Sequence, residues 1–168
     1  MSTGVSIAVV VVLFSISAVM AFSETAFTRA SRIRLRTAAE DGDKRAERLL
    51  TLFEHPEQTL NSVLLIVLIT QMTSATLLGS VFESKAGPLG FLLGTVAEVF
   101  LFFTFGEVAP KTYAVKYPEK SALAMSSLLW FMTHFWPLRI FSRAFIGLAN
   151  VILPGKAAAD SAFVTRSE

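Results

Sequence analysis

Cysteine is absent from the 168 residues of this chain. Its absence excludes disulfides, thiolate metal sites and a cysteine nucleophile within the chain. Histidine is scarce: His55 and His134 lie far apart in the sequence and form no spaced pair of the kind that binds zinc or copper. Charged residues make up only 17% of the chain, and the net charge is +2. Acidic residues are interleaved with the basic ones, which argues against a nucleic-acid partner.

Enzyme signatures are absent too. The sequence has no H-E-x-x-H, no G-x-S-x-G and no P-loop. It also lacks the paired aspartates or the serine–histidine couple that an intramembrane protease would need. We therefore predict a protein that is not an enzyme.

Apolar residues, in contrast, are in excess, at 53% of the chain. They gather in three blocks, each of a length that suits a membrane span: 4–23, 60–82 and 89–105. No Lys or Arg precedes the first block, and it is longer than the apolar core of a signal peptide, so we favour a span over that alternative. The short, turn-like linker 83–88 predicts that the second and third blocks form a helical hairpin.

The distribution of Lys and Arg predicts the orientation of these spans. Residues 29–58 contain seven of them, whereas the linker 83–88 contains only Lys85. By the positive-inside rule, 29–58 and the region after residue 110 are cytoplasmic, and the N-terminus and the hairpin turn are outside. Within 39–58, an apolar stripe beside charged residues predicts a cytoplasmic amphipathic helix that ends at Pro56.

A fourth apolar stretch, 121–155, is interrupted by Pro137 and has basic residues on both sides of its first half. Two interfacial helices fit this pattern better than a fourth span, which is the alternative. The predicted fold class is an all-α membrane protein with three transmembrane helices plus juxtamembrane and interfacial helices, the N-terminus outside and the C-terminus cytoplasmic. The transmembrane domain would cover 1–155, and the polar tail 156–168 would be a linker.

Carboxylates inside or beside a span are candidate functional groups because burying them is costly. Glu107 stands out. Pro110 has no N–H, so in an α-helix the carbonyl of Gly106, four residues earlier, loses its donor. A bare carbonyl beside a carboxylate is the arrangement with which broken helices bind cations in transporters. The plain alternative is a helix that ends at the interface, with Glu107 solvated.

Glu24 follows Ser23 at the cytoplasmic end of the first block. Its plain interpretation is an ion pair with Arg29 or Arg32. The hydroxyl of Ser23 is expected to bond the carbonyl oxygen four residues earlier, as serines in helices often do.

The second block carries Thr70, Gln71 and Ser74 on one helical face. They are either interhelical hydrogen-bonding groups or neutral oxygen ligands, which would suit a hard cation such as Mg²⁺ or Na⁺. Glu98 lies inside the third block, and its plain interpretation is a hydrogen bond to a polar partner such as Gln71 or Thr73; a place in an ion path is the alternative.

Two motifs identify a resemblance. The stretch 23-SETAFTRASRIRLR-36 resembles the "SETA…S…RL" end of the first helix in the CorC/cyclin-M (CNNM) magnesium transporters. The stretch 105-FGEVAPKTYAVKYPEKSA-122 resembles their "FGE-x-x-PK…A…P…A" signature. The order and the spacing agree over roughly residues 5–155.

The resemblance implies a homodimer in the cell membrane, with cytoplasmic CBS domains that bind ATP after the linker. It also implies Mg²⁺ between the helices, where Ser23, Gly106 and Glu107 match the motifs of the family. Gln71 would replace the second asparagine of the "G-N-x-x-x-N" stretch found in many members, whose "GN" is missing here. The implied function is Mg²⁺ transport, in the direction of export, with a nearly dehydrated ion as the substrate. The alternative is a membrane anchor or Mg²⁺ sensor that transports nothing.

Overall fold

A computed structural model describes residues 2–138, 140–141, 144 and 147. Within these residues the chain is helical and contains no strand. Its elements are, in order, α1 (Thr3–Arg29), α2 (Arg32–Glu40), α3 (Lys44–Leu52), α4 (Pro56–Leu101), the π-helix η1 (Phe102–Val108), α5 (Ala109–Lys116) and α6 (Pro118–His134).

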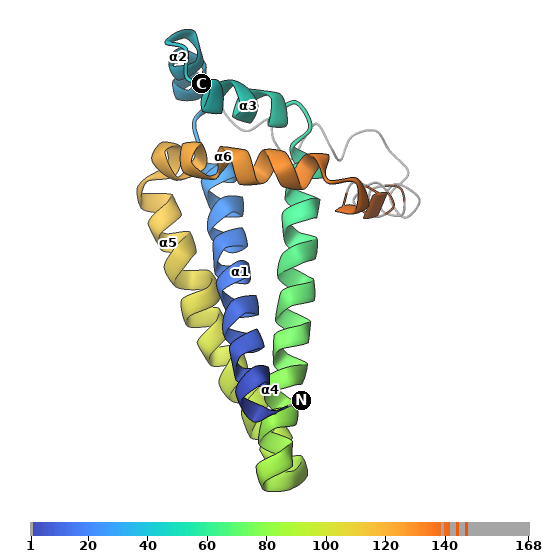
Figure 1. The fold of residues 1–168 in the computed structure, drawn as a ribbon. Helices are drawn as coiled ribbons and strands as arrows, with labels where there is room; N and C mark the ends of the chain where they lie inside the picture. The colour runs from blue at the N-terminus through green and yellow to red at the C-terminus, as the bar shows by residue number, and fades with distance from the viewer. Residues whose placement is uncertain (1, 139, 142–143, 145–146, 148–168) are drawn as a thin grey trace.

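The helix α4 folds back on itself at Gly87. This glycine has φ 64° and ψ −156°, a conformation that is essentially restricted to glycine, and Pro88 follows it. We call 56–86 the descending limb and 88–116, which runs on through η1 and α5, the returning limb. Together with α1 they form three long rods (Figure 1). The hairpin expected around 83–88 is therefore present, with its break at a single residue.

Glycines allow the two limbs to approach closely. Gly79 lies against the ring of Phe91, and Gly94 lies against the ring of Phe82. At Gly90, a Cβ would stand only 2.4 Å from the carbonyl oxygen of Phe82. Small residues at a helix contact let two backbones come together, as is common between helices in membranes.

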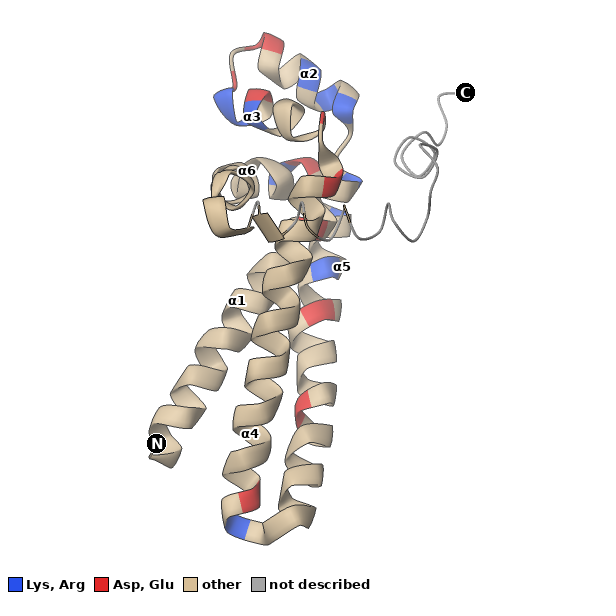
Figure 2. Cartoon of the chain, turned by 90° about the vertical axis from the view of Figure 1, so that its right-hand side faces the viewer, with Lys and Arg blue, Asp and Glu red and all other residues tan. Residues whose placement is uncertain are grey.

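Along the rods, small and polar side chains are buried and large apolar ones are exposed, which is the opposite of the pattern in a soluble protein. The buried positions are mostly small or polar, such as Ser17, Thr70 and Ser74, whereas Met72 is 63% exposed and Phe100 71% exposed. The shafts of the rods are almost free of charge, and charges gather at the α2–α3 end and at the hairpin tip (Figure 2).

Two helical stretches among the described residues are long and apolar enough to cross a membrane: Thr3–Arg29 and Pro56–Lys116. Only 22% and 28% of their most apolar windows are buried in the protein. The core helix of a soluble protein would be mostly buried, so these apolar surfaces need lipid around them. The chain is an all-helical membrane protein.

The helices α2, α3 and α6 form a head at one end of the rods, where α6 lies across them (Figure 1). The core of this end contains Phe27, whose ring stacks on that of Phe53 with 4.3 Å between centroids. Leu35, Leu49 and Leu129 are buried with them. This packing fixes the head to the C-terminal end of α1.

The amphipathic helix expected within 39–58 is α3, which ends at Leu52. Pro56 begins α4 and does not end α3, because proline suits the first turn of a helix, where its missing N–H is not needed. The sequence had not predicted α2. The first half of 121–155 lies in α6, which runs across the rods, and its interfacial position stays a prediction; most of 142–155 and all of 156–168 lie outside the described residues.

Candidate metal centre

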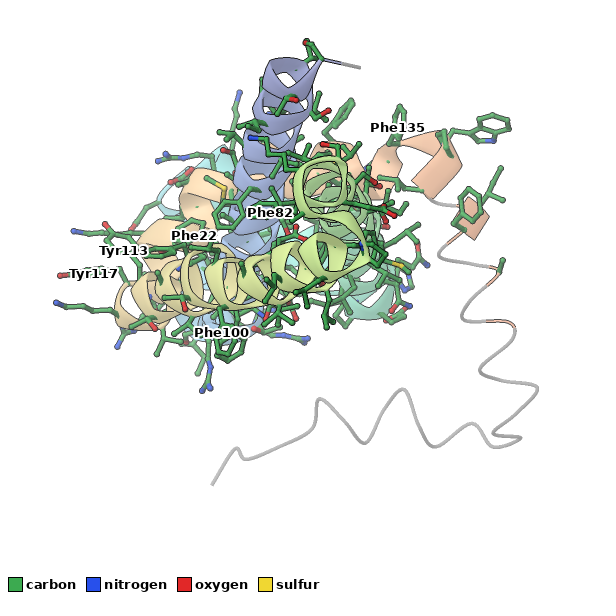
Figure 3. The ribbon with its side chains drawn as sticks, turned by 90° about the horizontal axis from the view of Figure 1, so that it is seen from below. Phe22, Phe82, Phe100, Tyr113, Tyr117 and Phe135 are labelled. Atoms are coloured by element: carbon green, nitrogen blue, oxygen red, sulfur yellow. The ribbon has the colours of Figure 1, made fainter. Side chains whose placement is uncertain are left out.

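The returning limb runs parallel to α1, and two contacts between aromatic rings fix the register of the two. Phe14 meets Phe102 edge to face, with 5.6 Å between ring centroids. Higher up, the rings of Phe22 and Tyr113 are 6.0 Å apart (Figure 3). Since Gly106 is one helical turn above Phe102, it lies at about the level of residues 17–18 of α1.

The segment around Gly106 is wound as a π-helix. The N–H of Ala109 donates to the carbonyl oxygen of Thr104, five residues earlier. The next N–H in this register would belong to Pro110 and would reach Phe105. Because Pro110 has no N–H, it serves neither the Phe105 carbonyl in the π register nor the Gly106 carbonyl in the α register. Pro110 therefore leaves a gap among the hydrogen-bond donors where the π-helix passes into α5, while the bare carbonyl expected at Gly106 stays a prediction; π-bulges are frequent at functional sites.

Gly106 is buried, and Glu107 is half-buried beside it. A Cβ at Gly106 would meet the ring of Phe102 at 3.5 Å, which is an ordinary contact, so space alone does not require glycine here. Within the described residues, the Glu107 carboxylate has neither a hydrogen bond nor an ion pair. The π-helix thus presents an unpaired carboxylate next to an irregular stretch of backbone.

Glu24 pairs with Lys111, with 3.4 Å between Oε2 and Nζ. The expected pairing with Arg29 or Arg32 is therefore wrong. Lys111 lies four residues after Glu107, and its ammonium contacts the carboxylate on α1. This ion pair joins α1 to α5 just above the π-helix.

Ser23 is fully buried, and its hydroxyl donates to the carbonyl oxygen of Val19 at 2.7 Å, as predicted. Its oxygen can still accept or coordinate. By the register of α1 with the returning limb, Ser23 lies above Gly106. The residue on α1 at the level of Gly106 is Ser17, which is buried and whose hydroxyl has no partner in the described residues. The sequence alone gives no signal that selects Ser17 from the other serines of α1.

Gln71 is half-buried on the descending limb. The two limbs are antiparallel, and Ser74 lies beside Glu98. Continuing this register places Gln71 near residue 101, roughly 7 Å below Gly106 at 1.5 Å per residue. No hydrogen bond joins any two of the four predicted ligands in the described part of the chain. In this conformation Gly106 and Glu107 are neighbours, Ser23 is above them and Gln71 below, and the ligand set stays a prediction.

Glu98 has no hydrogen-bond partner at either carboxyl oxygen among the described residues. Neither Gln71 nor Thr73 is the polar partner expected for Glu98, since Thr73 bonds the Ile69 carbonyl at 2.7 Å, and the polar residue that lies beside Glu98 is Ser74. Thr70 is likewise satisfied by its own helix, at 2.8 Å from the Ile66 carbonyl.

No group of three or more His, Cys, Asp or Glu side chains that could hold a metal occurs in the part of the chain that the structure describes. A cation near Gly106 would therefore have one carboxylate and neutral oxygens around it. Oxygen-only surroundings suit a hard ion.

Comparison with known proteins gives the family. The profile described as the cyclin M transmembrane N-terminal domain (CNNM) matches residues 8–168. The chain is 33% identical over 137 residues to the UPF0053 inner membrane protein YfjD of Escherichia coli (strain K12), an alignment that covers 82% of this chain and 31% of that protein. It is 24% identical over 150 residues to a UPF0053 protein of Haemophilus influenzae, covering 86% and 36%.

A third relative, the polyamine export protein of Haemophilus influenzae, is 27% identical over 164 residues, covering 87% of this chain and 36% of that protein. The chain spans about a third of the length of the curated relatives it matches. Because the profile covers nearly the whole chain, the protein belongs to the CNNM family.

Proposed function

We propose that this domain transports Mg²⁺ across the membrane, in the direction of export, with its cation site at Gly106 and Glu107. The observation that carries the proposal is the half-buried Glu107 carboxylate, which has no partner within the described residues. It adjoins a π-helix that Pro110 deprives of a donor. An anchor has no use for an unpaired carboxylate beside a π-helical irregularity in a membrane-spanning limb.

Mg²⁺ prefers six oxygens in compact octahedral geometry and gives up its water reluctantly. Glu107 would supply the anionic ligand, and the Gly106 carbonyl a backbone ligand. Ser23 and Gln71 would complete the shell from α1 and the descending limb. Since these two lie on other levels, binding requires the rods to shift along one another.

The π-helix offers a way to make that shift. Rewinding Phe102–Val108 into α geometry would turn Glu107 by about one residue, roughly 100°, relative to the lower part of the limb. Such a change would move the carboxylate between two directions around the rod. Alternating access would then combine this rotation with the sliding of the rods.

The proposed topology has all three rods crossing the membrane, with the N-terminus and the hairpin tip outside. It rests on the seven Lys and Arg residues within 29–58, which lie on the head side, against the single Lys85 near the tip. A homodimer, and CBS domains that bind ATP in the full-length protein, belong to the same proposal.

A second candidate substrate is an organic polycation. The observation that favours it is the relative named polyamine export protein, to which this chain is 27% identical over 164 residues. A polyamine, like Mg²⁺, would be bound by carboxylate and neutral oxygens. The two substrates differ in size and in hydration, so transport assays separate them.

The test is flux in proteoliposomes that contain the full chain, with Mg²⁺ and spermidine measured separately. We expect Mg²⁺ flux in the wild type and in Glu83→Gln, which removes an exposed carboxylate at the hairpin tip. We expect it to be lost in Glu107→Gln. Wild-type flux in Glu107→Gln would remove Glu107 from the site. Spermidine flux alone would favour the second candidate, and no flux of either would favour an anchor or sensor.

A further inference from the structure

Glu98 is an ionisable residue that the proposed metal site does not use. It faces the interior of the bundle on the returning limb and is 3% exposed. Both of its carboxyl oxygens lack a hydrogen-bond partner within the described residues, as does the hydroxyl of Ser74. Ser74, on the descending limb, is close enough to Glu98 to interact with its carboxyl group as a donor, although the two groups do not meet hydrogen-bond geometry in this arrangement. Three buried oxygens without partners thus adjoin each other between the two limbs.

No opposite charge is available to Glu98. Residues 3–23 of α1 and 59–82 of the descending limb contain no titratable side chain. Between residues 86 and 106 of the returning limb, Glu98 is the only one. The nearest charged residue along its own limb is Glu107, nine residues later, and Lys85 lies on the other side of the turn, on the descending limb. A carboxylate without a partner would be very unfavourable in such surroundings.

A metal ion would find too few ligands here. The three free oxygens are half of an octahedral shell, and the helix carbonyls around them are engaged in intrahelical bonds. A proton, in contrast, needs only one oxygen. The resulting carboxylic acid has an O–H that can donate to Ser74 and a C=O that can accept from it. All three oxygens would then have partners.

We propose that Glu98 binds a proton in the interior of the bundle, with the Ser74 hydroxyl as its hydrogen-bond partner. This proton site is roughly 14 Å along the limb from Glu107, at 1.5 Å per residue. It is thus distinct from the cation site.

Release of the proton requires water to reach the gap between the limbs. The O–H bond of the carboxyl then breaks, its electron pair stays on the oxygen, and the proton passes to water; binding reverses these events. The carboxylate favours the hydrated, open arrangement, and the protonated form favours the closed one seen here. Coupling of this exchange to cation flux rests on the proposed transport function, whereas proton binding itself does not.

Infrared spectroscopy of the full chain in lipid at neutral pH tests proton binding directly, because the carbonyl stretch of a protonated carboxyl is separate from that of a carboxylate. We expect a protonated band in the wild type and in Glu83→Gln, and its loss in Glu98→Gln. A band that survives Glu98→Gln, or no band in the wild type, overturns the proposal. A band that appears only after Na⁺ is removed would assign the site to sodium and overturn it too.

Ser74→Ala provides a second test that leaves the carboxyl in place, should Glu98→Gln not fold. Loss of the hydroxyl partner should move the wild-type band to higher frequency, and an unmoved band would contradict the pairing. In flux assays, a proton gradient should accelerate cation flux through the wild type. The same gradient should leave the flux through Glu98→Gln unchanged. If the wild type shows the infrared band but no flux, the transport function fails while the proton site stands.

Discussion

Replacing Gly90 by alanine tests the close approach of the two limbs. The added Cβ would lie 2.4 Å from the carbonyl oxygen of Phe82 and 2.9 Å from the Cβ of Ala86. Real Cβ atoms essentially never approach closer than 3.0 Å, so the two limbs would have to separate by at least about 0.6 Å. The obstacle is backbone, which cannot rotate away as a side chain can.

The size of the effect follows from two opposing terms. Overpacking of a close contact costs typically 1–3 kcal/mol, whereas glycine to alanine inside a helix gains about 1 kcal/mol. The clash with backbone puts Gly90→Ala toward the upper part of the first range. We therefore expect a net loss of about 1–2 kcal/mol in the free energy of unfolding.

Two other glycines serve as matched comparisons. At Gly4 nothing lies within 4 Å of the added Cβ, so Gly4→Ala should be neutral or slightly stabilising. At Gly79 the clash is with the side chains of Phe91 and Thr95, which can turn, so the loss should be intermediate. Thermal unfolding in the same detergent should rank the variants Gly4→Ala, Gly79→Ala, Gly90→Ala, from most to least stable. A Gly90→Ala protein as stable as Gly4→Ala would refute the geometry of the hairpin.

Three further predictions concern the head and its junction with the rods. Phe27→Ala removes a fully buried ring and should lower the free energy of unfolding by about 3–5 kcal/mol. A loss of less than about 1 kcal/mol would contradict the burial of this ring. Glu24→Gln removes the partly exposed ion pair with Lys111 and should cost only about 0–1 kcal/mol, less at high salt, as denaturant titrations at two salt concentrations would show. Hydrogen bonds from Arg45 hold the pKa of Asp43 below its usual 3.8 in the folded protein. The ionised Asp43 therefore stabilises the folded state above pH 3.8, and this stabilisation is lost as the pH falls through the lower pKa of the folded protein. Thermal midpoints measured against pH should show this acid-side loss in the wild type and not in Asp43→Asn, which keeps an N-cap side chain.

The three rods could be predicted from the sequence, because each contains an apolar block whose length and near lack of charge are visible in the sequence. An uncharged apolar block of membrane length becomes a helix wherever it lies in the bilayer. The turn at Gly87 was also predictable, since Gly-Pro after Ala86 is a strong helix-breaking signal. The hydroxyl of Ser23 donates to the carbonyl of Val19, four residues earlier in the same helix, and serines in helices commonly make this bond.

What the sequence did not predict depends on contacts between distant segments. Glu24 pairs with Lys111, 87 residues away, whereas only neighbours in the sequence had been considered. The environment of Glu98 is set by the register of the limbs, which the glycine contacts determine. The π winding of Phe102–Val108 departs by one residue from the α-helix assumed from Pro110, and the packing of Phe102 on Phe14 accompanies it.

The reversal at Gly87 also has a consequence for how this protein enters a membrane. Without it, the 61 residues Pro56–Lys116 would form one helix about 90 Å long, three times the thickness of the hydrocarbon core. The positive φ of Gly87 therefore replaces one helix that is too long to span a membrane by two antiparallel limbs. The start of the first limb and the end of the second then lie at the same end of the molecule. Alone, the returning limb would present Glu98 to lipid during insertion. Entering as a hairpin, it keeps that carboxyl against Ser74, so the turn that shapes the fold also shields an ionisable side chain from lipid.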